Sequence, residues 1–83
     1  MNYVYLLKSL KDNWTYVGST QDLQKRFRQH NNGEVKATNF YKPLNLVYYE
    51  AYRDLEMARK REKEIKVSAI EKDRILKRIG LRK

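Results

Sequence analysis

The chain has 83 residues, a length that predicts one domain, residues 1–83, with one modest hydrophobic core. It contains no cysteine, which excludes disulfides, zinc–thiolate sites and thiol nucleophiles, and no apolar run approaches the roughly 20 residues of a membrane span. The net charge of +9 favours either a polyanionic partner such as nucleic acid or only a lysine-rich, solvated surface. A membrane partner is the weaker interpretation because the basic helices lack a free apolar face, and we expect a cytoplasmic protein.

The first third of the sequence predicts a β-hairpin followed by a helix. Residues 3–7 and 14–18 are apolar or aromatic at most positions, and the short polar connection between them indicates antiparallel pairing. Thr20 or Asp22 can then cap a helix that runs to about residue 32, where an Asn-Asn-Gly run ends it.

Four further segments are predicted in the remainder of the chain. In order they are a polar loop at 34–43, a strand at 44–52, a helix from its cap Asp54 to about residue 67, and a last helix that ends at Gly80. Ser68 and Glu71 form a capping box at the start of that last helix. The order β-β-α-β-α-α predicts an α+β fold, in which a small three-stranded antiparallel β-sheet is flanked by helices.

The first predicted helix carries two polar residues on its sheet-facing side. Successive side chains rotate by about 100° around a helix, so Leu23 and Phe27 form an apolar stripe. His30 falls within this stripe, and Arg26 borders it on the same side, one turn before His30. We therefore expect both to lean toward the tyrosines of the sheet. Taken alone, such a histidine is more often a hydrogen-bonded core residue than a catalyst.

The next helix carries a carboxylate on its apolar face. Leu55, Ala58 and Ile65 define that face, and Glu62 lies between the last two. A carboxylate in such a place is costly unless a partner compensates it. Arg26, a metal ion or tyrosine hydroxyls could each do so. An ion pair with Arg26 that only fixes the packing explains the residue at least as well as a metal site.

Several motifs follow one another in a fixed order along the chain. They are the triplets Tyr3-Val4-Tyr5 and Tyr16-Val17-Gly18, the run 19–26, the Arg26…His30-Asn31 end of the first helix, the run 43–50 and the segment 58–66. This ordered set resembles the GIY-YIG nucleases, from Tyr3 to about Ile70. The resemblance is closest to the small stand-alone bacterial members related to the N-terminal domain of the excinuclease C subunit, and it implies a GIY-YIG endonuclease-like fold.

The resemblance also implies a set of catalytic roles. Glu62 would hold one Mg²⁺ or Mn²⁺ ion that polarises the scissile phosphate. Tyr5, helped by His30, would orient or deprotonate the attacking water. Tyr16 and Arg26 would bind the phosphate and offset its developing negative charge.

Four positions near these residues complete the comparison with the family. Gly18 would let the backbone turn tightly beside the site. Tyr3 replaces the glycine that opens the family name, and Ser19 replaces a lysine of the repair members. The late asparagine of several family enzymes has no clear counterpart, since Arg74 occupies the approximate spacing.

The sequence thus predicts a metal-dependent endonuclease that cleaves DNA with structure or weak sequence selectivity, in repair or recombination. A non-catalytic, basic nucleic-acid-binding module of the same fold is the alternative. A third hypothesis is an adaptor that docks on a larger repair or recombination protein through an exposed apolar patch on the last helix, around Ile75, Leu76 and Ile79. Plain core packing is the favoured explanation of those three residues. Phosphate contacts away from the site are expected from basic helix residues, namely Lys60, Lys63 and Lys72.

Overall fold

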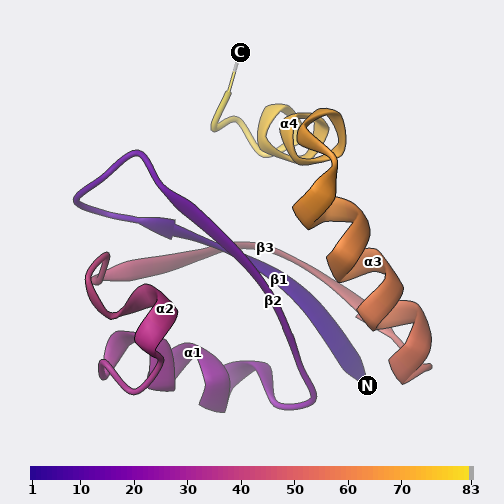
Figure 1. Cartoon of the computed structure of the whole chain (residues 1–83), viewed down its shortest axis with the longest axis horizontal. Coiled ribbons are helices and arrows are strands. Elements are labelled where there is room, and N and C mark those ends of the chain that lie inside the picture. The colour runs from indigo at the N-terminus through magenta and orange to yellow at the C-terminus, as the bar shows by residue number, and fades with distance from the viewer. Residues whose placement is uncertain (83) are drawn as a thin grey trace.

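The computed structural model describes residues 1–82 and contains one sheet with helices on both of its faces (Figure 1). The elements, in chain order, are β1 (Asn2–Ser9), β2 (Thr15–Thr20), α1 (Leu23–Asn31), α2 (Lys36–Asn39), β3 (Leu44–Tyr52), α3 (Leu55–Val67) and α4 (Ala69–Arg78). This arrangement confirms the predicted fold. No helix in the described part of the chain is both long and apolar enough to cross a membrane.

One helix was missing from the prediction. The segment 34–43, expected to be a polar loop, contains α2. A single helical turn is too short to show a hydrophobic period, so the sequence pattern carries little sign of it. The turn matters for the site because it buries Thr38, which is fully inaccessible to solvent.

The sheet has the strand order β2-β1-β3, and both pairs of strands are antiparallel. The central strand β1 places Tyr5 opposite Gly18 of β2 on one side and opposite Tyr49 of β3 on the other. The register between β1 and β3 shifts between Leu6 and Leu7. Because β2 is an edge strand, helices on either face can reach around it, and the candidate site lies along this strand.

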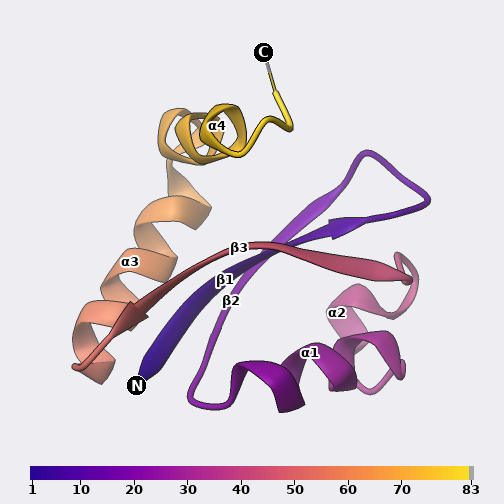
Figure 2. The same cartoon turned by 180° about the vertical axis from the view of Figure 1, so that it is seen from behind.

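Alternation along β1 divides the core between the two faces of the sheet. Val4 and Leu6 point to the face that α3 and α4 cover, whereas Tyr5 and Leu7 point to the face that α1 covers. Figure 2 shows the two pairs of helices on opposite sides of the strands. The partners on the first face include Ala58 and Ile65, and those on the second include Leu23 and Phe27.

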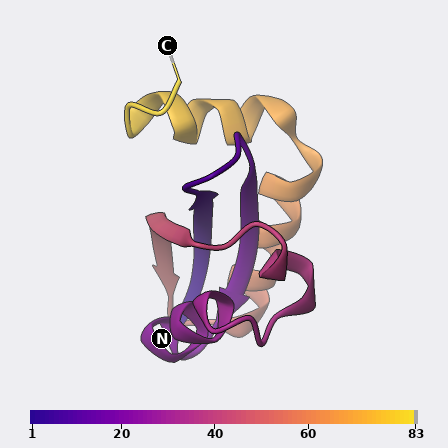
Figure 3. The ribbon, with the colours of Figure 1, turned by 90° about the vertical axis from the view of Figure 1, so that its left-hand side faces the viewer.

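The last helix turns the residues of the expected apolar patch into the core. Figure 3 shows α4 lying across the direction of the strands. Ile75 and Leu76 are only 4% and 2% exposed, and Ile79 is partly buried against the same core. The hypothesis of an exposed apolar patch at these residues is therefore wrong, because α4 turns them toward the sheet.

Side-chain caps set the starts of the three longer helices. Asp22, Asp54 and Ser68 accept hydrogen bonds from the backbone N–H groups of Lys25, Glu56 and Glu71. The capping box at Ser68 is only half formed, because the carboxylate of Glu71 binds Arg61 instead. Gly33 follows α1 with a φ of 78°, the left-handed conformation expected of a helix-ending glycine.

The C-terminal end of α1 is tied to the first residue of β3. Asn31 Nδ2 donates to the carbonyl of Leu44 at 2.9 Å, and the N–H of Leu44 donates to Asn31 Oδ1 at 2.7 Å. The side-chain amide thereby satisfies both backbone groups of one strand residue. This pair of bonds fixes the end of α1 that carries His30.

Candidate functional site

A buried chain of hydrogen bonds joins β1 to α1 and α2. The Tyr5 hydroxyl oxygen lies 2.8 Å from His30 Nε2, and His30 Nδ1 lies 2.7 Å from Thr38 Oγ1. The Thr38 hydroxyl donates to the carbonyl of Val35 at 3.4 Å. It therefore accepts from Nδ1–H of His30, which leaves Nε2 to accept from the Tyr5 hydroxyl. Since Tyr5 and His30 are 2% and 0% exposed, bulk solvent does not compete for these hydrogen bonds.

Both members of the Tyr5–His30 pair are uncharged at neutral pH. Burial and, to a smaller extent, the nearby positive charge of Arg26 together lower the pKa of His30 to about 4. Burial raises the pKa of Tyr5 to about 12, an increase that Arg26 opposes. An imidazole with a free lone pair thus contacts a phenol that still holds its proton.

The second tyrosine connects this pair to α3. The ring centroid of Tyr16 lies 6.4 Å from that of Tyr5 and 5.3 Å from that of His30. Lys66 of α3 places its ammonium nitrogen 5.9 Å from the centroid of the Tyr16 ring. Tyr16 is only partly buried, so it lies between the enclosed pair and solvent.

Gly18 makes room for the Tyr5 hydroxyl. A Cβ atom at this position would lie 2.5 Å from the Tyr5 hydroxyl oxygen and 2.6 Å from its Cζ, closer than unbonded atoms approach. The prediction of a tight turn at Gly18 is wrong, because the residue lies inside β2 and its φ is not positive. The glycine is required by the space that the tyrosine opposite occupies.

Arg26 projects from α1 toward the same group with its charge uncompensated. Its Nη1 donates to Gln29 Oε1 at 3.1 Å. Among residues 1–82, no carboxylate forms a salt bridge with it. Its charge lowers the pKa of His30 and opposes the rise at Tyr5, so it acts on both members of the buried pair. A guanidinium in this state can bind an anion without first breaking an ion pair.

Glu62 reaches the site from the opposite side of β2. Its Oε1 accepts a hydrogen bond from Ser19 Oγ at 2.6 Å, and its Oε2 lies 2.7 Å from Lys66 Nζ. The ion pair with Arg26, one of the partners considered for this carboxylate, is not formed, because α1 and α3 lie on different faces of the sheet. The negative charge of Glu62 nevertheless contributes to the raised pKa of Tyr5, after the larger effect of burial.

This geometry coincides with a match to a known family. Residues 1–69 match the model of the GIY-YIG catalytic domain. The chain belongs to the GIY-YIG family.

The GIY-YIG relatives of this chain include small proteins of similar length. A UPF0213 protein of Clostridium perfringens is 46% identical over 67 residues, covering 80% of this chain and 71% of that protein. One from Staphylococcus saprophyticus is 40% identical over 72 residues, covering 86% and 87%. The solution NMR structure of a UPF0213 protein from Bacillus halodurans superposes with a TM-score of 0.58 at 32% identity, covering 93% of this chain and 84% of that one.

Within the GIY-YIG site, the oxygen donors suit a weakly held divalent cation. No group of three His, Asp or Glu side chains that could enclose a metal occurs in the described part of the chain. Glu62 offers a carboxylate whose side chain is 19% exposed, with the Ser19 hydroxyl beside it. Mg²⁺ is commonly bound through one or two carboxylates while water and substrate phosphates complete its shell. The residues present fit such an ion, provided that Lys66 gives up its contact.

A hollow of about 380 Å³ lies beside the candidate site. It is lined by the β2–α1 connection and by α1, through Ser19, Thr20, Gln21, Asp22, Lys25, Arg26 and Gln29. Arg26 and Ser19 therefore line one concave surface. A backbone phosphate could enter it beside the arginine.

The three lysines predicted to contact phosphate lie outside that hollow. Lys60 is exposed and lines a different one, with Glu50 and Arg61. Lys63 is exposed on α3, and Lys72 is partly buried on α4, where burial followed by the charge of Arg82 lowers its pKa. Their roles in binding remain predictions.

Four residues at or near the candidate site were given no role there by the sequence analysis. Lys66 stands one helical turn after Glu62, a spacing that predicts an ion pair. Side chains two residues apart in a strand share a face, so the buried Val17 would have placed Ser19 on the face that α3 covers. Arg59 lines a further hollow with Ser19, which no pattern had indicated. Thr38 had no signal, because its burial depends on how α2 folds against His30.

Proposed function

We propose that this protein is a metal-dependent endonuclease that hydrolyses phosphodiester bonds in DNA. Membership of the GIY-YIG family supports a nuclease with a nucleic-acid substrate. The observation that carries the proposal is the uncompensated Arg26 beside the uncharged Tyr5–His30 pair. This arrangement combines a binding group for a phosphate with a path for a proton, the two requirements of phosphodiester hydrolysis.

The buried pair handles the proton of the attacking water. With a pKa of about 12, Tyr5 is not a phenolate at neutral pH, so it cannot act as a base alone. A water that enters the site with the phosphate gives its proton to Tyr5, while the proton of Tyr5 passes to Nε2 of His30, which is neutral and positioned to accept it. The phosphate's negative charge stabilises the imidazolium that forms. Thr38 holds the required tautomer by accepting from Nδ1–H.

The remaining groups hold the phosphate and its charge. Arg26 donates to the non-bridging oxygens, and the hydroxyl of Tyr16 adds a further donor from the partly exposed side. Glu62, assisted by Ser19, holds Mg²⁺ or Mn²⁺. When bound, the ion supplies Lewis-acid stabilisation of the phosphate and the leaving oxygen. The catalytic set is thus Tyr5, Tyr16, Arg26, His30 and Glu62.

The selectivity and the biological setting are also part of this proposal. We propose structure selectivity or weak sequence selectivity within one GIY-YIG domain, because a phosphate contact such as that expected of Arg26 carries no sequence information. A role in DNA repair or recombination fits such selectivity, and a larger repair or recombination protein would supply any further specificity. The reaction would take place in the cytoplasm.

Cleavage of a panel of labelled nucleic acids tests this proposal. Supercoiled plasmid, branched DNA, single strands and structured RNA are incubated with Mg²⁺, with Mn²⁺ and with EDTA. We expect metal-dependent cutting by the natural protein and none by Glu62→Ala, while Glu64→Ala, an exposed change on the same helix, keeps its activity. Circular dichroism confirms that both variants are folded. Cutting by Glu62→Ala at the natural rate would exclude the carboxylate from the reaction.

A non-catalytic binding module is favoured by one observation. Lys66 neutralises the carboxylate that a metal would need. If that pair is permanent, the domain binds nucleic acid through its basic surface and cuts nothing. Tight binding with no cutting under any metal supports this alternative, and Glu62→Ala should then bind slightly more tightly because a negative charge is lost.

A further inference from the structure

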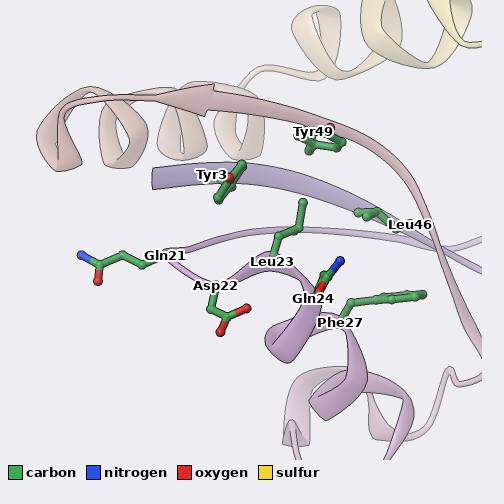
Figure 4. Close-up of a pocket in the computed structure, with 8 residues that line it drawn as sticks. All are labelled: Tyr3, Gln21, Asp22, Leu23, Gln24, Phe27, Leu46 and Tyr49. Atoms are coloured by element: carbon green, nitrogen blue, oxygen red, sulfur yellow. The ribbon is translucent and has the colours of Figure 1, made fainter. Parts of the chain in front are cut away.

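A second hollow lies on the α1 face of the sheet, on the side away from β2. This groove of about 550 Å³ is lined by Tyr3, Gln21, Asp22, Leu23, Gln24, Phe27, Leu46 and Tyr49, and we call it the aromatic groove (Figure 4). Figure 4 shows the rings of Tyr3, Phe27 and Tyr49 around it, from β1, α1 and β3. None of the catalytic residues proposed above lines it.

The walls of the aromatic groove suit a flat, polar-edged ring. Tyr3 and Tyr49 meet edge to face, with ring centroids 5.9 Å apart, and Tyr49 leaves 55% of its surface exposed. Gln21 and Gln24 supply amides that can both donate and accept hydrogen bonds. The carboxylate of Asp22 is engaged in capping α1. No lysine or arginine is among the lining residues, so the groove itself is unsuited to a phosphate.

The aromatic groove is adjacent to the hollow that contains Arg26. Gln21 and Asp22 line both of them. Tyr3 and Tyr5 also stand two residues apart on one face of β1, which places them about 7 Å apart along the strand. One side of the β2–α1 connection therefore offers cations, and the other offers aromatic rings.

We propose that the aromatic groove binds the base of one unpaired nucleotide next to the phosphate held by Arg26. This inference rests on the proposed function, because it assumes that a phosphodiester occupies the neighbouring hollow. Stacking on Tyr49 and Tyr3 holds the ring, and the glutamine amides contact its polar edge. A paired base in a duplex is already stacked and cannot enter. The substrate is therefore a single-stranded or splayed segment of DNA.

Binding without catalysis tests the groove. In EDTA, fluorescence anisotropy compares a short thymidine oligonucleotide with an abasic oligonucleotide of the same length and charge. The natural protein should bind the oligonucleotide with bases about tenfold more tightly, the typical contribution of one stacked base. Tyr49→Ala should remove most of that difference, while Tyr49→Phe should keep it, because stacking needs the ring and not the hydroxyl.

The matched control is Phe40→Ala, which removes an aromatic ring that is 72% exposed and does not line the groove. It should leave the difference unchanged. Equal affinity of the natural protein for the two oligonucleotides would overturn the proposal, and so would an equal loss on both from Tyr49→Ala. The readout needs no cleavage, so failure of the nuclease assay with a retained preference for bases separates the two proposals.

Discussion

The two faces of the sheet carry polar networks of opposite character. On the α3 face, the carboxylate of Glu50 accepts hydrogen bonds from Tyr48 and Tyr52. Arg61 adds a two-pronged ion pair to it, with N–O distances of 2.9 and 3.0 Å, and also bonds Glu71. Each charge in this cluster faces an opposite one. It is a closed structure with little capacity left for a ligand.

The network on the α1 face lies beside a positive charge that has no negative partner among the described residues. Tyr5, His30 and Thr38 form an uncharged chain, and the neighbouring Arg26 has no counter-charge among the described residues. Arg26 is only partly buried and lines an open hollow, so an anion can reach its guanidinium group. The comparison teaches that one sheet separates two tasks. The paired charges hold α3 in place, and the unpaired charge is left for the substrate.

The largest expected effect on the cleavage rate comes from a substitution in the network on the α1 face. Arg26→Ala should lower the cleavage rate by about a thousandfold, because it removes a donor aimed at the phosphate in the transition state. Stability should change little, since no ion pair is lost. Cleavage kinetics and urea unfolding check the two halves of this prediction. Arg28→Ala, an exposed change on the same helix, is the control and should cut normally.

A substitution in the network on the α3 face should have the opposite effect, a loss of stability with little change in the cleavage rate. Arg61→Ala should destabilise the fold by about 4 kcal/mol, since it leaves the Glu50 carboxylate without its cation in a largely buried place. Urea unfolding measures this loss. At a temperature where the variant is still folded, its cleavage rate should stay close to the natural one. A large loss of rate in the folded variant would contradict the division of tasks.

The pH dependence of stability should separate the two networks. The folded pKa of His30 is about 4 and its ordinary value is 6.5, so the unfolded chain binds the extra proton between these values and stability falls as pH drops through that window. Burial alone would raise the pKa of Glu50, but Arg61 and the tyrosines outweigh it and lower it to about 2 from 4.5. Its contribution is therefore lost between pH 4.5 and 2. Each step is about 3 kcal/mol.

Two variants assign these steps when unfolding is followed across pH. His30→Asn should flatten the slope above pH 4 and leave the lower one. Glu50→Gln should remove the slope below pH 4.5 and leave the upper one. A slope that persists above pH 4 in His30→Asn would mean that another group titrates there.

The smallest expected effect concerns the ion pair between Lys66 and Glu62. Lys66→Met removes the ammonium that neutralises Glu62, so a metal no longer competes with it. Because Lys66 is 47% exposed, the gain is modest, and half-maximal activity should need two- to fivefold less Mg²⁺. A titration of cleavage against Mg²⁺ measures it. Lys36→Met, which removes an exposed lysine of α2, should not shift the titration.

Much of the fold could be predicted from local patterns. The apolar and aromatic content of 3–7 and 44–52 and the caps Asp22 and Asp54 locate strands and helices, because each pattern reflects a local geometry. The same reasoning directed Arg26 and His30 toward the sheet. It could not name their partners, because a helix face indicates a direction and not the residue that meets it.

The misses share this physical cause. The helical wheel put Glu62 near the core, but only the fold shows that Ser19 and Lys66 satisfy it and that Arg26 lies across the sheet. Gly18 was expected at a tight turn. A glycine is needed there because the ring of Tyr5 on the neighbouring strand leaves no room for a side chain. Interactions between residues far apart in the sequence decide such details.

The two hydrogen bonds of Asn31 have a consequence for assembly. An amide that satisfies both backbone groups of Leu44 occupies the place that a neighbouring strand would take at the start of β3. Exposed strand edges are templates on which other chains add and aggregates grow. By ending α1 against this edge, the chain obstructs the register from which a second molecule could extend the sheet.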